Sequence, residues 1–101
     1  MPAKFTLRPE AEDDLENIWD YTAEVWNPEQ ANDYTKLLFS RFHSLAKRPA
    51  TARSAEHVLP DMRASPCGSH VIYFIKTAYG IDIVRILHQS QDVKTQLNQS
   101  W

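Results

Sequence analysis

The sequence lacks the features that mark several classes of protein. Of its 101 residues only Cys67 is a cysteine, which excludes an internal disulfide and a multi-cysteine metal site. The longest uninterrupted apolar run, Val71 to Ile75, is far shorter than the roughly 20 residues that cross a bilayer. No basic start followed by an apolar stretch stands at the N-terminus, so no signal peptide is expected. These absences predict a soluble, cytoplasmic protein in a reducing compartment.

Motifs of common enzyme classes are absent as well. The chain has two glycines and no Gly-rich phosphate loop, no HExxH and no GxSxG. Its four histidines are scattered without the spacing of metal ligands, so neither a metal site nor a cofactor is expected. Cys67 with His70 three residues later is weak evidence for a nucleophile, which also needs an oxyanion site.

The charge is divided unevenly along the chain. Hydrophobic residues make up 43% and charged residues 24%, values typical of one globular domain over residues 1–101. Residues 1–33 hold nine acids and two bases, a charge of −7, whereas residues 34–101 hold four acids and nine bases, a charge of +5. The net charge of −2 hides this division. It indicates either an acidic helix beside an ordinary basic surface, or a basic patch for a polyanion or an acidic partner.

Two helices are predicted in the first half of the chain. After a short strand over residues 3–7, Pro9 opens a helix whose apolar stripe runs to Trp26. Asn27 and Pro28 then cap and begin a second helix, which ends before Pro49. So tight a connection predicts an antiparallel hairpin with a shared core. We expect that core to contain Leu15, Ile18, Leu38 and Phe42.

Strands are predicted in the second half. Residues 49–62 are expected to form a loop, 63–67 an edge strand, and 70–76 and 81–88 two strong strands. Strict alternation along the last strand would place Arg85 on one face with Ile81 and Ile83. The order β-α-α-β-β-β predicts an α+β fold, with the helical hairpin packed on one face of a small antiparallel sheet. The other face is expected to be open, and residues 89–101 to form a polar C-terminal tail.

Arg85 is a candidate site residue because it interrupts a strongly apolar strand. An unpaired buried charge is costly, so its guanidinium must reach water, a carboxylate or a phosphate. One interpretation is an ion pair with Asp82, Asp61 or an acid of the first helix. The other is contact with a partner or a polyanion.

A ribonuclease set can be assembled from Glu56, Arg63, Arg85 and His88. The carboxylate would remove the proton of a 2′-hydroxyl, the arginines would hold the phosphate, and the histidine would protonate the leaving oxygen. The spacing alone does not show that these side chains converge. Two tryptophans are candidates for partner contact instead: Trp26 at the end of the first helix and Trp101 at the end of the tail.

Four segments taken together resemble one protein family. The segments are LRPEAEDDLENIWDYTAEVWNPEQANDY, SLAKRPATAR, CGSHVIYFI and IVRILHQSQD. In this order and spacing they resemble the ParE toxins of bacterial type II toxin–antitoxin systems, which belong to the RelE/ParE superfamily. The resemblance spans about residues 7–92 and implies the same β-α-α-βββ fold.

The resemblance also implies a function. ParE members are known as inhibitors of DNA gyrase that act in plasmid stabilisation and are not enzymes, whereas their RelE relatives cut mRNA on the ribosome. Arg63 and Arg85 match superfamily arginines of the sheet, and His88 matches the histidine of the ParE strand-end motif. The basic cluster is thin and the tail has no tyrosine, which favours gyrase inhibition. The alternative is a ribosome-dependent mRNA endoribonuclease that uses Glu56, Arg63, Arg85 and His88.

A partner is implied too. A ParD-like antitoxin would fold an amphipathic, acidic segment onto the toxin and form a hetero-oligomer with at least two copies of each chain. Its expected contacts on this chain are Arg63, Arg85, His88, Trp26 and Trp101. Because the net charge is negative, we do not expect the chain to bind DNA directly on its own.

Overall fold

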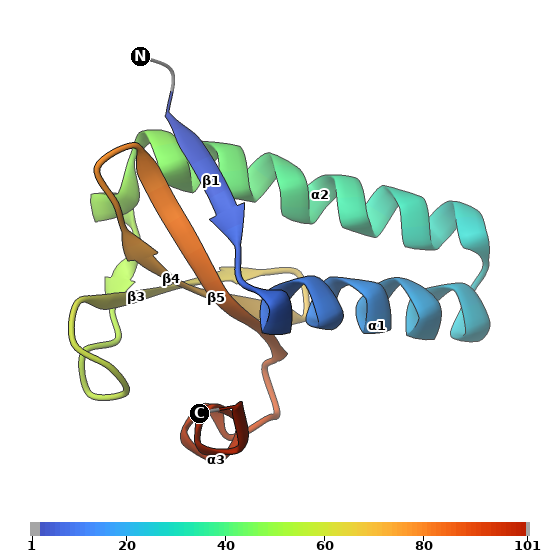
Figure 1. The fold of residues 1–101 in the computed structure, drawn as a ribbon. Coiled ribbons are helices and arrows are strands. Elements are labelled where there is room, and N and C mark those ends of the chain that lie inside the picture. The colour runs from blue at the N-terminus through green and yellow to red at the C-terminus, as the bar shows by residue number, and fades with distance from the viewer. Residues whose placement is uncertain (1–2, 101) are drawn as a thin grey trace.

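The computed structural model, which describes residues 3–100, contains the predicted β-α-α-β-β-β elements together with a further short strand and a C-terminal helix (Figure 1). Residues 98–100 are described by their backbone alone. The elements are β1 (Lys4–Leu7), α1 (Pro9–Val25), α2 (Pro28–Lys47), the 3-10 turn η1 (Pro49–Thr51), β2 (Arg53–Ser54), β3 (Met62–Cys67), β4 (His70–Lys76), β5 (Gly80–His88) and α3 (Val93–Ser100). The predicted α+β class is therefore confirmed.

The helical hairpin forms where the sequence signals predicted it. Pro9 occupies the first turn of α1 and Pro28 that of α2, where a missing amide proton costs nothing. The Asn27 side chain caps α2 by accepting the amide proton of Gln30 at 2.7 Å. Between the two helices, the Trp19 indole donates to Asn32 Oδ1 at 2.9 Å. These contacts hold α1 and α2 side by side.

The sheet is mixed, whereas the sequence was interpreted as wholly antiparallel. Its order is β1-β5-β4-β3-β2, and β1 runs parallel to β5 with Phe5 opposite Ile81. The two helices between β1 and the other strands form a connection long enough to permit parallel pairing. The two-residue β2 lies within the expected loop and pairs with β3, so β3 is not the edge strand.

A β-bulge interrupts the alternation of β5. The register shifts so that Tyr73 opposes Arg85 while Phe74 opposes Ile83, which leaves Val84 without a partner opposite. Ile83 and Ile86 consequently reach the same core, and Val84 reaches the other face. The prediction that Arg85 shares a face with Ile81 and Ile83 is wrong for this reason.

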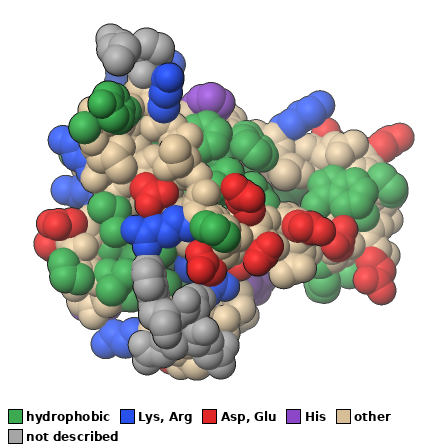
Figure 2. All heavy atoms as spheres, viewed as in Figure 1, with side chains coloured by type: hydrophobic (Ala, Val, Ile, Leu, Met, Phe, Trp, Pro, Cys, Tyr) green, Lys and Arg blue, Asp and Glu red, His purple; other side chains and the backbone are tan. Residues whose placement is uncertain are grey.

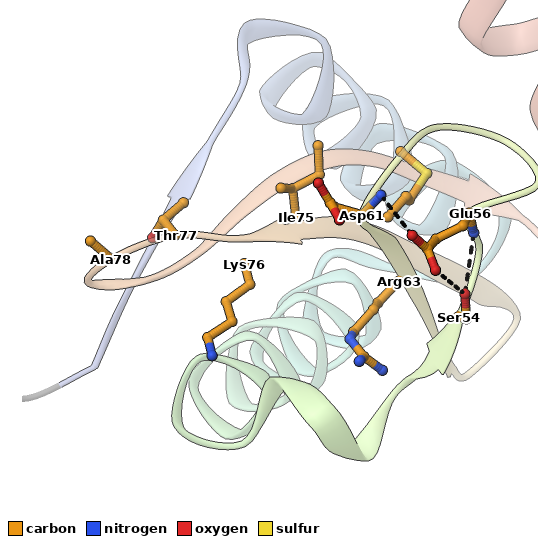
Figure 3. A pocket seen from close by; sticks show the side chains of 9 residues that line it. Ser54, Glu56, Asp61, Arg63, Ile75, Lys76, Thr77 and Ala78 are labelled. Carbon is orange, nitrogen blue, oxygen red and sulfur yellow. Dashed lines mark hydrogen bonds between the residues drawn. The ribbon is translucent and has the colours of Figure 1, made fainter.

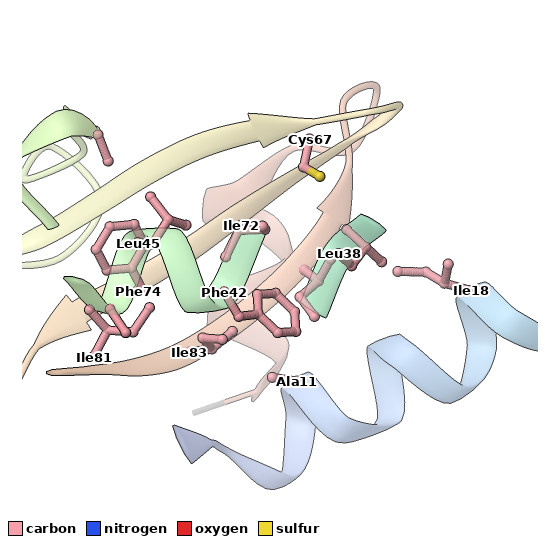
Figure 4. Packing of buried hydrophobic residues seen from close by; sticks show 13 residues of the cluster. Ala11, Ile18, Leu38, Phe42, Leu45, Cys67, Ile72, Phe74, Ile81 and Ile83 are labelled. Carbon is pink, nitrogen blue, oxygen red and sulfur yellow. The ribbon is translucent and has the colours of Figure 1, made fainter. Parts of the chain in front are cut away.

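The main core lies between the helical hairpin and the sheet (Figure 4). Leu38 and Phe42 of α2 are fully buried and pack with Ile18 of α1, as predicted. Leu15 is only partly buried, but it contacts the same cluster. The strands contribute their large apolar side chains to this cluster, including Ile72, Phe74, Ile81, Ile83 and Ile86.

The second face of the sheet is covered, contrary to the prediction of an open face. Leu97 of α3 is 3% exposed and packs there with Met62 and Val84. The segment between β2 and β3 adds Ala55, Val58 and Leu59 to this cluster. Val93 and Leu97 are four residues apart and share one helix face, a stripe hidden in a tail that appears polar. Within the described residues, no helix has the length and apolar character to span a membrane.

Candidate functional site

The four residues of the ribonuclease hypothesis fall into two separate recesses. Glu56 and Arg63 line a recess of about 500 Å³ (the first recess; Figure 3), and Arg85 and His88 line one of about 320 Å³ (the second recess). Arg63 opposes Phe74 on β4, whereas His88 opposes His70 at the far end of that strand. Four residues of strand correspond to about 13 Å. The structure therefore does not bring the four side chains together.

Arg85 in the second recess is paired with Asp14 of α1. Its Nε and Nη2 donate to Asp14 Oδ2 and Oδ1 at 2.7 and 2.9 Å, and its Nη1 donates to the Gln96 carbonyl of α3 at 3.2 Å. Both charged side chains are about a tenth exposed. The hydrogen bonds that Arg85 donates to Asp14 raise the pKa of Arg85 above its ordinary value, although burial acts to lower it. Of the two interpretations of Arg85, the ion pair with an acid of the first helix is the one observed.

Sequence reasoning missed the role of Asp14. Acids crowd the first turns of α1, where the helix dipole favours them, so Asp14 did not stand out. Its position did carry a signal, however. It follows the buried Ala11 by three residues and precedes the buried Ile18 by four, so it lies on the apolar stripe. A carboxylate on a buried stripe needs a cationic partner, and Arg85 is the cation within an apolar strand.

Two histidines and a tyrosine meet beside this ion pair. The Tyr34 hydroxyl lies 2.6 Å from His70 Nδ1 and accepts the amide proton of Ser69 at 3.0 Å. The rings of His70 and His88 meet edge to face, with centroids 5.4 Å apart. Burial, followed by the charge of His88, lowers the pKa of His70. No pattern in the sequence predicted this cluster, because Tyr34 appeared only as one member of the apolar stripe of α2.

The turn before β4 is shaped around Tyr34. Gly68 has φ of +59°, and a Cβ at this position would lie 2.6 Å from the Tyr34 hydroxyl oxygen. Glycine alone combines this left-handed conformation with such close approach. The exposed His88 at the end of β5 is held locally, since its Nδ1 accepts the Ser90 amide proton at 3.1 Å.

In the first recess, the predicted residues make local contacts. Arg63 is half-buried, and its Nη1 donates to the Ala52 carbonyl at 2.8 Å. Glu56 accepts from the Ser54 hydroxyl at 3.5 Å and from the Asp61 amide at 3.4 Å, contacts that tie it to its own loop. Lys76 lines the same recess, and Figure 3 shows Arg63 and Lys76 extending to the same side of their strands. No group of three metal-ligating side chains occurs within residues 3–97.

Exposed apolar side chains gather at the tip of the hairpin. Tyr21, Val25 and Trp26 are 67%, 53% and 69% exposed where α1 ends, and we call these three residues the hairpin tip. Figure 2 shows hydrophobic side chains at this end of the molecule and acidic side chains along α1. Trp26, which was predicted to contact a partner, thus lies on an accessible surface. Trp101, the other predicted tryptophan, lies outside the described residues.

Comparison with known proteins identifies the family. A model of the ParE toxin of type II toxin-antitoxin systems, parDE, matches residues 5–93. The chain therefore belongs to the ParE toxin family. Toxin ParE1 of Mycobacterium tuberculosis is 36% identical over 98 residues, which cover 96% of this chain and all of that protein. Toxin ParE1 of Caulobacter vibrioides is 31% identical over 93 residues, covering 92% of this chain and 96% of that protein.

More distant relatives agree with this assignment. Toxin ParE of Escherichia coli is 29% identical over 94 residues, covering 92% of this chain and 91% of that protein. A solved chain of the chromosomal ParDE TA system from P. aeruginosa superposes with a TM-score of 0.73. It covers 86% of this chain and 96% of its own length, and at 18% identity it shows that the fold is shared.

Proposed function

We propose that this ParE-family toxin inhibits DNA gyrase by binding it, without catalytic chemistry of its own, and is neutralised by a ParD-like antitoxin. The family suggests the target, and the observation that favours binding over catalysis is the separation of the candidate ribonuclease residues. A carboxylate base, a phosphate-holding arginine and a histidine acid must all reach one phosphodiester, within hydrogen-bond distance of the atoms they serve. Here Glu56 and Arg63 line one recess, and His88 lines another.

The state of Arg85 supports the same proposal. An arginine that stabilises a transition-state phosphate must present its donors to the substrate. Nε and Nη2 of Arg85 are directed at Asp14, and Nη1 is directed at Gln96. A phosphate in the second recess would also meet the negative charge of Asp14. These contacts suit a residue that joins α1, α3 and β5 better than one that holds a substrate.

The hairpin tip supports the antitoxin part of the proposal. Exposed apolar side chains that gather in one patch mark an interaction site, and tryptophan and tyrosine are enriched among the residues that dominate binding energy. An amphipathic antitoxin helix could bury the apolar tip with its own apolar face. Contacts of the antitoxin with Arg63, Arg85 and His88 stay a prediction.

The experiment uses the purified wild-type toxin in two assays. In the first, gyrase supercoils a relaxed plasmid and is scored for inhibition and for accumulation of cleaved DNA. In the second, a reporter mRNA is translated in vitro and its integrity is followed. The proposal expects inhibition of gyrase, reversed by the antitoxin, and intact mRNA. Ribosome-dependent cleavage of mRNA with unimpaired gyrase would establish the endoribonuclease alternative and overturn the proposal.

A further inference from the structure

Four cations gather at the C-terminal end of α2, the start of β3 and the end of β4. Lys47 ends α2 and Arg48 follows it, while Arg63 lies on β3 and Lys76 ends β4. We call these four residues the basic end. Lys47, Arg48 and Lys76 are exposed, and Arg63 is half-buried. Figure 2 shows Lys and Arg side chains at the left of the view, with an acidic side chain among them, while a row of acids follows α1.

The basic end is a continuous hollowed surface. The first recess, of about 500 Å³, is lined by Arg63 and Lys76. A neighbouring recess of about 450 Å³ is lined by Lys76 and Lys47, and a third of about 350 Å³ by Lys47 and Arg48. Shared lining residues therefore join the three recesses from β3 across to the end of α2.

None of the four cations of the basic end forms an ion pair within the described part of the chain. The two ion pairs there are Arg8 with Asp82 and Arg85 with Asp14, both beside α1. Glu56 and Asp61 also line the first recess, but neither forms an ion pair with Arg63 or Lys76, and Glu56 is bonded to its own loop. With Glu56 and Asp61 counted, the basic end still has four positive charges against two negative ones, which creates a local positive potential.

We propose that the basic end binds the phosphodiester backbone of a nucleic acid. Ser44 and Thr77 line the recesses beside the cations, and their hydroxyl groups can donate to phosphate oxygens. Tyr79, 68% exposed, lines the middle recess, and its hydroxyl group can donate to a phosphate oxygen. A nucleic acid fits the basic end better than an amphipathic acidic peptide does. Such a peptide would also need apolar contacts, and the exposed apolar side chains of the hairpin tip lie in another part of the molecule.

This inference revises the expectation that a negative net charge precludes binding of nucleic acid. The net charge of −2 is a sum over the whole chain, and it hides an acidic helix and a basic end that lie in different parts of the molecule. Local charge decides contact with a phosphate backbone, whereas the acidic face weakens the overall attraction. Binding is therefore weak, independent of base sequence and strongly dependent on salt. The inference goes beyond gyrase inhibition and does not rest on it.

The test measures binding of a labelled duplex DNA of about 20 base pairs by fluorescence anisotropy, at salt concentrations from about 50 to about 200 mM. With four phosphates neutralised, affinity should fall by about 100-fold across this range. Lys47→Gln and Lys76→Gln should each weaken binding and reduce the magnitude of the slope of log K against log salt by about 1. A thermal melt of each variant verifies that it is folded.

Lys36→Gln is the matched control. Lys36 is an exposed lysine of the same helix, nearer its other end, so the variant changes the net charge equally but leaves the basic end intact. It should keep the wild-type slope. Absence of DNA binding at about 50 mM salt would overturn the proposal. Equal losses of DNA affinity in Lys36→Gln and Lys47→Gln would also overturn it. So would tighter binding of a poly-glutamate peptide than of a DNA of equal charge, because that result would indicate a surface for acidic proteins.

Discussion

Asp14 of α1 holds Arg85 of β5 with both of its carboxylate oxygens. The same carboxylate accepts the Ile86 amide proton at 2.9 Å, so a single side chain fixes the first helix to the guanidinium and to the backbone of one strand. Arg85 in turn donates to the Gln96 carbonyl. The pair thereby joins the helical hairpin, the sheet and α3 at one point.

Breaking this pair should destabilise the fold strongly. Asp14→Asn leaves a buried guanidinium without its counter-charge, and we expect a loss of about 3 kcal/mol in the free energy of unfolding. The double variant Asp14→Asn/Arg85→Gln should recover part of that loss, because no uncompensated charge remains. Urea denaturation of the wild type and both variants measures these free energies.

Arg8→Gln is the control. The pair of Arg8 with Asp82 is about a quarter exposed, so this replacement should cost no more than about 1 kcal/mol. Equal small losses in Asp14→Asn and Arg8→Gln would refute this role.

Two adjacent leucines of α2 should respond very differently to truncation. Leu38 is fully buried in the main core, whereas Leu37 is 47% exposed. Leu38→Ala should lower the free energy of unfolding by about 2–5 kcal/mol, since it removes buried methyl groups and leaves a cavity. Leu37→Ala changes helix propensity by the same amount as Leu38→Ala, but it should cost less than about 1 kcal/mol because the side chain is exposed. An unchanged denaturation midpoint for Leu38→Ala would contradict the described core.

Stability should fall on mild acidification because of His70. Its pKa in the folded chain is lowered from the ordinary 6.5 by burial and by His88, so the unfolded chain binds a proton more readily. The stability that His70 contributes is present above the unfolded pKa and is lost as the pH falls through the folded pKa. Between about pH 7 and pH 5, the free energy of unfolding should decline more steeply for the wild type than for His70→Gln.

His57→Gln is the control for this pH dependence, because His57 is exposed in the loop before β3. It should follow the wild-type pH profile, which separates the effect of His70 from that of any histidine. Parallel profiles for the wild type and His70→Gln would show that His70 does not contribute to the pH dependence.

The helical hairpin could be predicted because its signals are local. Pro9, Asn27 and Pro28 mark the helix starts, and the spacing of Ile18, Leu38 and Phe42 marks the buried faces. Strand identity in β4 and β5 was equally local, since β-branched and aromatic residues fill both segments. These features need no knowledge of distant contacts.

What could not be predicted depends on long-range pairing. The parallel pairing of β1 with β5 and the bulge at Val84 depend on the partner strand, so no local sequence pattern predicts them. Similarly, Asp14 and Arg85 are 71 residues apart, and only the folded chain brings them together. The cover that α3 forms over the second face depends on two apolar residues, Val93 and Leu97, within a polar tail.

The hairpin tip should dominate recognition of the antitoxin. Trp26→Ala removes the largest exposed apolar side chain of the tip, and we expect about a 30-fold weaker complex with a ParD-like antitoxin, equivalent to about 2 kcal/mol. Tyr79→Ala is the matched control, since Tyr79 is exposed to the same extent, 68% against 69%, but lies at the basic end. Isothermal titration calorimetry measures both. Full affinity of Trp26→Ala would place the antitoxin elsewhere.

Inhibition by binding is tested most directly by titrating gyrase with wild-type toxin and with His88→Gln, while supercoiling is followed at two gyrase concentrations. His88 is exposed at the strand end, so its replacement should leave the fold intact. The account predicts that inhibition follows binding, does not progress with incubation time, and differs little between the two proteins. Supercoiling that the wild type leaves unimpaired would contradict the account. Ribosome-dependent mRNA cleavage in a parallel translation assay, lowered by about 10²–10⁴ in His88→Gln, would then reveal an acid catalyst.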